Sequence, residues 1–192
     1  MASPMTKERS SFMLQTKSSG MSSPSQRRCS VAQLILRVLA VAFTAAAISV
    51  TVTSGQSVVI LGFTFKARYS YSSAMRFLLG VDAVVCAFSA LSLIFVYLLL
   101  NRSGSHLTNY FYLFLHDMVM TVLMISGCAA ATAVGYIGRY GEERIGWGAV
   151  CGRIGKFCNR NLVSLVLSYL TFLAYLALAI ISASKLMSRA TE

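Results

Sequence analysis

Charged residues are scarce in this sequence, and acidic residues are the scarcest. Among 192 residues there are 6 Asp and Glu against 17 Lys and Arg, and charged residues together make up 12%. Water-soluble domains carry about 25% charged residues, so the composition excludes an ordinary soluble domain. There are only 2 prolines, Pro4 and Pro24, and both precede every long apolar run. No apolar run is therefore interrupted by a residue that breaks helices.

The residues that catalysis and metal binding use are also few. The sequence has 2 His and 5 Cys, without a metal-ligand cluster, a nucleophile–base pattern or a phosphate-binding loop. It therefore predicts no enzyme, no cofactor and no metal site. The net charge is +11, but the basic residues do not form a stripe on any segment that could fold as a soluble domain. We therefore expect them to contact the surface of a lipid bilayer, and we expect no nucleic-acid binding.

Four long apolar runs are what the sequence does contain, and the mean hydropathy is +0.68. Each run has the roughly 20 residues that a helix needs to cross about 30 Å of hydrocarbon. Spanning segments of this length must be helical, because unpaired backbone groups are not tolerated in lipid. None has a polar face, which excludes a soluble bundle. The sequence predicts an all-α, four-helix transmembrane bundle within residues 31–185, with helices at about 33–54, 77–100, 109–134 and 162–184.

The two ends of the chain are polar. Residues 1–30 are rich in Ser, Lys and Arg without apolar periodicity, and we expect a disordered cytoplasmic tail there. Residues 186–192 are expected to form a short cytoplasmic tail. A cleaved signal peptide does not fit, because the polar stretch and the apolar run that follows are both too long. A chloroplast transit peptide is the alternative for residues 1–30.

The distribution of Lys and Arg does not by itself decide the orientation. The N-terminal tail, the 101–108 loop and the C-terminus hold five, one and two, and the loops on the opposite side hold three and five. Two features favour cytoplasmic termini. Arg27 and Arg28 flank the first helix, which usually dominates orientation, and the second outer loop holds Cys151 and Cys158, which suit an oxidising compartment.

Two charges lie within apolar runs in the same leaflet. Arg37 is about 6–9 Å, and Asp117 roughly 12 Å, inside the cytoplasmic ends of their helices at 1.5 Å per residue. Because an intramembrane charge needs a partner, we predict an Arg37–Asp117 ion pair that fixes helix register. Snorkelling of Arg37 to the headgroups and a proton relay are the alternatives. Asp82 lies in the opposite leaflet, where outer-side groups or water must satisfy it.

Small residues and cysteines supply the other candidate sites. Gly127, Ala131 and Gly135 recur at four-residue spacing, which favours close helix packing within the bundle or in a dimer. The spacing of Cys151 and Cys158 is compatible with a disulfide. Cys29, beside two arginines and just before the first helix, is a candidate for lipidation.

The residues together resemble a known family. The features are the first-helix Arg, the third-helix Asp, the motif YIGRYG, and W-x3-C-x6-C within GWGAVCGRIGKFCN, preceded by YSYSSAMRFLLGVDAVVCAFSALSL. This pattern, over about residues 31–185, is similar to that of the plant Casparian strip membrane protein-like (CASP-like) family. The sequence has Ser72-Ser73-Ala74 where that family usually has Asp-Leu-Pro, and it lacks the acidic-aromatic first-loop signature of the founding members.

The resemblance implies a plant plasma-membrane protein with cytoplasmic termini that forms homodimers, heterodimers or higher oligomers with family members. The family's founders form a membrane scaffold that bars lateral diffusion and localises lignin-forming machinery of the cell wall. The expected function is therefore a self-associating scaffold that organises membrane domains. The alternative is a small solute or proton transporter or channel that uses Arg37 and Asp117.

Overall fold

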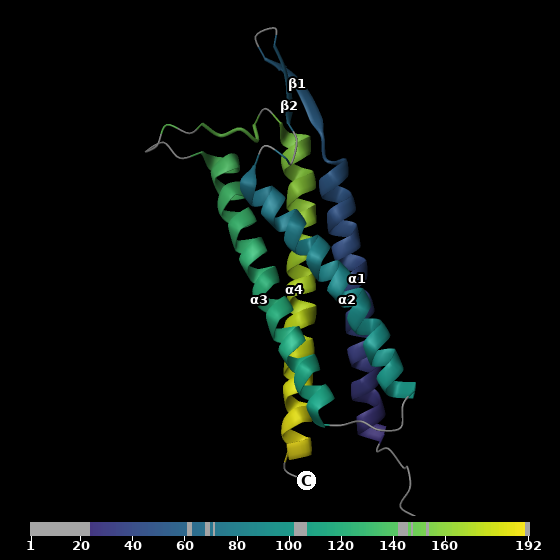
Figure 1. Ribbon diagram of the computed structural model, residues 1–192. Helices are drawn as coiled ribbons and strands as arrows, with labels where there is room; N and C mark the ends of the chain where they lie inside the picture. The colour runs from purple at the N-terminus through teal and green to yellow at the C-terminus, as the bar shows by residue number, and fades with distance from the viewer. Residues whose placement is uncertain are drawn as a thin grey trace, which may run out of the picture. The chain divides into compact units, whose positions relative to one another are not determined.

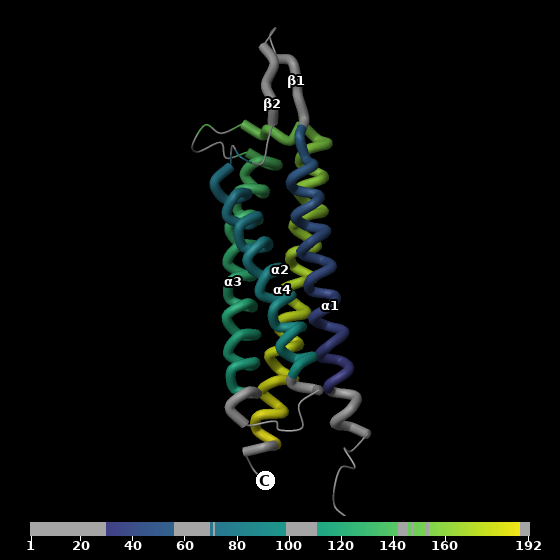
Figure 2. The backbone as a smooth tube through the Cα atoms, turned by 45° about the vertical axis from the view of Figure 1, so that its right-hand side comes forward, coloured from purple at the N-terminus to yellow at the C-terminus, as the bar shows by residue number. Residues whose placement is uncertain are grey.

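The structure is a computed structural model that describes residues 24–60, 63–67, 70, 72–101, 107–141, 146, 148–152 and 154–190. The chain divides into two units, Met1–Ala32 and Gln33–Glu192. Of the first unit, the structure describes the opening turns of α1. The second unit holds the helical bundle, and its four helices lie side by side (Figures 1 and 2).

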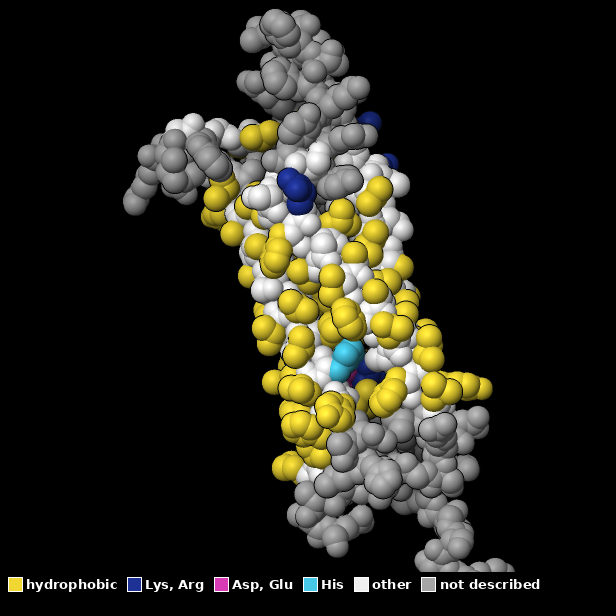
Figure 3. Space-filling view, viewed as in Figure 1, with side chains coloured by type: hydrophobic (Ala, Val, Ile, Leu, Met, Phe, Trp, Pro, Cys, Tyr) yellow, Lys and Arg dark blue, Asp and Glu magenta, His cyan; other side chains and the backbone are white. Residues whose placement is uncertain are grey.

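Four long helices make up most of the described residues: α1 Pro24–Thr53, α2 Ser73–Asn101, α3 Leu107–Tyr140 and α4 Gly155–Ala190. Each contains a segment long and apolar enough to cross a membrane, namely Ser30–Thr53, Ser73–Leu98, Phe111–Tyr140 and Gly155–Ser188. The predicted all-α fold with four long apolar helices is confirmed. Figure 3 shows hydrophobic side chains covering the central part of one face, as a surface in contact with lipid requires.

The helices extend past the apolar runs that predicted them. The run expected at 33–54 belongs to a helix that begins at Pro24, within the stretch assigned to the disordered tail; residues 1–23 of that tail lie outside the described residues. Proline favours the first helical position, where its missing N–H is not needed. α4 likewise begins at Gly155 and continues to Ala190, because nothing at the edge of the hydrocarbon ends a helix.

A two-stranded antiparallel hairpin follows α1, and it was not predicted from the sequence. β1 Gln56–Ile60 pairs with β2 Phe63–Ala67, in a register that places Val58 opposite Phe65. The hairpin lies at the end of the helical unit where α2 and α4 begin, and the C-terminus lies at the other end (Figure 1). These are called the hairpin end and the C-terminal end below.

The apolar core lies mainly between α2, α3 and α4. Its largest fully buried apolar side chains are Met124 of α3 and Leu178 of α4, with Val85 of α2 against them. α3 packs along more of its length against α4 than against α2. Gly127 permits the approach of α3 to α2, because a Cβ there would lie 3.3 Å from Leu78 Cδ1.

Candidate functional site: the buried polar network

Arg37 of α1 forms the centre of a polar network toward the C-terminal end of the bundle. Its Nη2 donates hydrogen bonds of 2.7 and 2.9 Å to the two carboxylate oxygens of Asp117 in α3. Its Nη1 donates a 2.8 Å hydrogen bond to Ser92 Oγ in α2. The side chains of Arg37 and Asp117 are both 0% exposed. A guanidinium and a carboxylate that are both removed from solvent need these hydrogen bonds, because each alone would be a costly buried charge. The third guanidinium nitrogen, Arg37 Nε, is buried and has no hydrogen-bond partner among the described residues.

The network continues from Asp117 toward the C-terminal end of α4. Ser182 Oγ donates a 3.0 Å hydrogen bond to Asp117 Oδ2 and accepts a 3.2 Å bond from Gln33 Nε2. Lys185 Nζ in turn donates a 2.8 Å bond to Gln33 Oε1. All four helices therefore contribute to one connected set of charges and hydrogen bonds. Such a set fixes the register of every helix relative to the others.

His116, next to the ion pair in α3, also contacts it. Its Nδ1 lies 3.3 Å from Asp117 Oδ1, and its side chain is 21% exposed. Its Nε2 is buried and has no hydrogen-bond partner among the described residues. The histidine is thus a polar group at the boundary between the network and the outer surface of the bundle.

A second buried carboxyl group, Asp82 of α2, lies toward the hairpin end. Ser168 Oγ of α4 lies 3.1 and 3.0 Å from its two oxygens. That hydroxyl has one hydrogen and also lies 3.2 Å from the Ser164 carbonyl oxygen. Asp82 is 0% exposed, and no cation is paired with it in the described part of the chain. Ser168 is therefore the polar group that satisfies Asp82; the sequence predicted such a group without identifying the residue.

Small polar side chains along one face of α4 bond to all three of the other helices. Two of them bond to the buried carboxyl groups of Asp82 in α2 and Asp117 in α3. Ser164 Oγ hydrogen-bonds to Thr51 Oγ1 at 2.6 Å and donates to the Ala47 carbonyl oxygen at 3.0 Å. Tyr175 hydrogen-bonds to Ser89 through their hydroxyl groups. The members of this α4 polar stripe that bond to other parts of the chain are Asn161, Ser164, Ser168, Tyr175 and Ser182.

Sequence reasoning missed the α4 polar stripe, although its signal is present. The run at 162–184, like the other three, was expected to have no polar face. Its polar residues recur at intervals of three, four or seven, which place them on one helix face. Small hydroxyl residues in membrane helices commonly bond across helices, so the periodicity could have been used.

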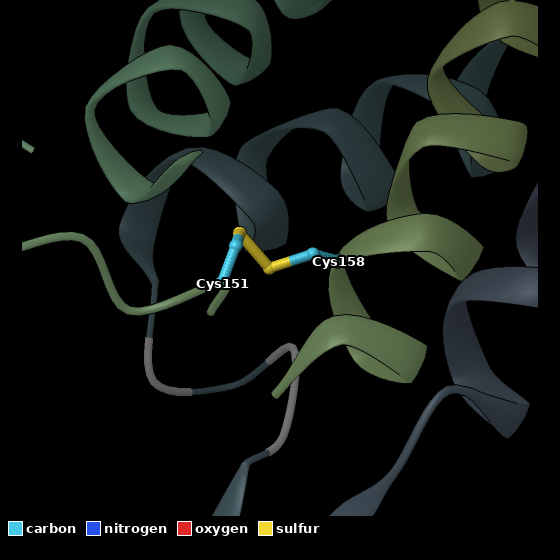
Figure 4. The surroundings of a disulfide bond; sticks show 2 residues. All are labelled: Cys151 and Cys158. Atoms are coloured by element: carbon cyan, nitrogen blue, oxygen red, sulfur yellow. A yellow bond between two sulfur atoms is a disulfide. The ribbon is translucent and has the colours of Figure 1, made fainter. Parts of the chain in front are cut away.

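The other sequence-predicted residues lie in three places. Gly127 and Ala131 face the bundle interior, whereas a Cβ at Gly135 would meet nothing within 4 Å. The sulfur atoms of Cys151 and Cys158 form a disulfide with Cα atoms 5.7 Å apart, between the segment before α4 and the first turn of α4 (Figure 4). Cys29 lies in α1, and its side chain lies outside the described part of the chain.

The end of α3 is anchored beside that disulfide. Gly141 follows the helix with a φ of 75° and donates its N–H to the Ile137 carbonyl oxygen at 2.8 Å, which closes the helix with a left-handed cap. The N–H groups of Val150 and Cys151 both donate to the Gly138 carbonyl oxygen at 3.0 Å. The segment before α4 is therefore held against the end of α3.

The network positions charge but leaves little that could bind a metal or react. In the described ranges, no group of three or more His, Cys, Asp or Glu side chains could hold a metal ion. The ion pair has no exposed surface. Its geometry is that of an enclosed ion pair between α1 and α3.

Comparison with known proteins places this network in a family. The model of the Casparian strip membrane protein domain matches residues 26–174, which cover both buried carboxyl groups and the disulfide. The chain belongs to the CASP-like family. It is a multi-pass membrane protein of this plant family, which is not known for enzymes.

Individual relatives in the family are similar over most of their length. The chain is 60% identical to "CASP-like protein 1F2" of Ricinus communis over 81% of this chain and 78% of the relative. It is 54% identical to "CASP-like protein 1F3" of Populus trichocarpa over 100% of both chains, and 35% identical to "CASP-like protein 1F1" of Arabidopsis thaliana over 79% and 87%. No solved structure matches this chain.

Proposed function

We propose that this protein is a plasma-membrane scaffold that self-associates and associates with CASP-like relatives, with both termini in the cytoplasm. In this role it organises membrane domains linked to modification of the cell wall. The observation that carries the proposal is the fully buried Arg37–Asp117 pair. Arg37 and Asp117 bond to each other inside the bundle, so they give it one shape and leave its outer faces free to meet lipid or other bundles.

A face of α1 supports lateral association. Ala42, Ala45 and Ser49 are exposed and recur at intervals of three and four residues. Small side chains let helix backbones approach closely, and dispersion contacts and hydrogen bonds then hold membrane helices together. A second bundle has room to pack against α1 here without displacing large side chains.

The alternative function, a small transporter or channel, would use the same Arg37 and Asp117. Transport requires that water or a solute reach these groups from at least one side. Both side chains are fully buried and already hydrogen-bonded to Ser92 and Ser182. The geometry therefore favours the scaffold over the transporter.

The test combines fluorescence recovery and a split reporter in plant cells. The tagged wild-type protein should gather in slowly exchanging domains and bring the two reporter halves together. The variant Ala45→Ile should weaken reporter assembly severalfold. Its matched control is Ala90→Ile, the same change at an exposed alanine of α2. A wild-type protein that spreads evenly, exchanges freely and fails to assemble the reporter would refute the scaffold.

A further inference from the structure

A groove of about 330 Å³ lies between α2 and α3 in the C-terminal half of the bundle. Aromatic and aliphatic side chains form most of its lining. They are Phe88, Leu91 and Phe95 of α2, and Tyr112 and Leu113 of α3. Leu91 is 59% and Tyr112 61% exposed, so the groove opens on the lipid-facing surface. Figure 3 shows a histidine side chain set among hydrophobic side chains on this face of the bundle.

The groove has a polar floor, formed by Ser92 and His116. Ser92 Oγ already accepts from Arg37 and donates to the Ser89 carbonyl oxygen at 2.9 Å. His116 Nδ1 is directed to Asp117. In the neutral imidazole, Nδ1–H is then the donor and Nε2 is an acceptor. That acceptor is buried and without a partner in the described residues, a situation that costs roughly as much as a lost hydrogen bond.

The floor lies at a defined depth. Ser92 precedes the end of α2 at Asn101 by nine residues (101 − 92), and His116 follows the start of α3 at Leu107 by nine (116 − 107). His116 is seven residues inside the apolar run that begins at about residue 109 (116 − 109), or about 10 Å along the helix axis. The polar floor is thus within the hydrocarbon on the side of the C-terminal end, and Phe88 and Leu91 lie deeper.

We propose that this groove binds a membrane sterol, whose hydroxyl donates a hydrogen bond to His116 Nε2 and whose ring system lies along Phe88 and Leu91 toward the bilayer centre. His116, which lines the groove, has one ring nitrogen without a partner among the described residues, and a sterol supplies one donor on an otherwise apolar body. The flat, rigid rings fit aromatic walls and lose less conformational entropy on binding than a flexible acyl chain does. Because Nε2 is covered, the hydroxyl reaches it through a small shift of the imidazole ring. The proposal does not depend on self-association.

The experiment uses the full-length protein in lipid nanodiscs and a photoreactive sterol that keeps its hydroxyl. Labelled peptides are identified by mass spectrometry, and unlabelled sterol competes with the probe. The sterol methyl ether, which cannot donate a hydrogen bond, is the matched competitor. We expect labelling of α2 and α3 at the groove, and competition by the ether about fivefold weaker than by the sterol, as for one lost hydrogen bond.

Two variants and one control locate the site. Leu91→Trp fills the groove and should reduce labelling at least tenfold, whereas Leu98→Trp, at a 54% exposed position outside the lining, should not. His116→Phe keeps an aromatic ring but removes the acceptor, so sterol and ether should then compete equally. A structural role of His116 alone would leave their ratio unchanged.

Three results would overturn the proposal. One is labelling that Leu91→Trp does not reduce. Another is equal competition by sterol and ether in the wild type. The third is a different occupant of the groove, seen either as equal labelling by a photoreactive phospholipid acyl chain or as cross-linking to a second copy of the chain.

Discussion

The two buried carboxyl groups are held in opposite ways. Asp117 meets a guanidinium, a serine hydroxyl and the edge of a histidine, and its network draws on all four helices. Asp82 is equally buried but meets one serine hydroxyl of α4. The comparison shows that burial alone does not tell how much a bundle depends on a carboxyl group. What matters is whether another buried charge depends on it in return.

The largest expected effect comes from removing the cation of the pair. Arg37→Met keeps an unbranched apolar side chain but leaves the Asp117 carboxylate buried without its partner. Breaking a buried ion pair in this way costs about 3–5 kcal/mol. We expect little protein to reach the cell surface and a markedly lower thermal midpoint in detergent, measured by fluorescence-detected size exclusion. Normal surface delivery and an unchanged midpoint would show that the pair is not a structural connection.

Neutralising each carboxyl group compares the two sites directly. Asp117→Asn removes the charge that Arg37 needs, and should cost on the order of 2–3 kcal/mol. Asp82→Asn has nearly the same shape, can still accept from Ser168, and leaves no described cation unpaired, so its effect should stay within about 1 kcal/mol. The comparison is wrong if thermal unfolding of the two variants shows equal destabilisation.

Removing one serine from each site tests dependence on a single hydroxyl. Ser168→Ala takes away the hydrogen-bond partner of Asp82 and should cost about 1–2 kcal/mol. Ser182→Ala leaves Asp117 with Arg37, so a loss of about 0.6 kcal/mol is expected, the average for a hydrogen bond between membrane helices. Parallel thermal unfolding curves measure both, and the reverse order would contradict this assignment of partners.

The smallest effect is expected from replacing the whole pair. In the double variant Arg37→Met with Asp117→Leu, no buried charge is left without a partner, and apolar side chains fill the space. Such replacements are often neutral or stabilising. Surface delivery should therefore recover relative to Arg37→Met alone. If the double variant is as defective as the single one, the guanidinium has a role beyond holding Asp117.

Some of this architecture could be predicted from the sequence, and some could not. Hydrophobic length determined the four helices, because lipid admits few other structures. Depth along the helices was enough to suggest Arg37 and Asp117 as partners, since few charges lie in the spans. The partner of Asp82 was harder to predict, because the hydroxyl of a serine in a membrane helix can donate its hydrogen bond to a carbonyl oxygen of the same helix. Ser49 does so to the Ala45 carbonyl oxygen. The hairpin formed by β1 and β2 was missed because each strand is stabilised by pairing with the other. The composition of one short segment gives little indication of such a partner.

The position of the disulfide has a consequence for the integrity of the chain. Cys151 and Cys158 close a small loop of their own and do not connect α3 covalently to α4. A cut between Gly141 and Cys151 would therefore yield two separate polypeptides, one with three spans and one with the last. Because α3 and α4 have the most extensive helix–helix packing in the described part of the bundle, the two pieces should find each other again in the bilayer. We therefore expect that the protein can be produced as two fragments, and that the extent of their association measures the strength of the α3–α4 interface.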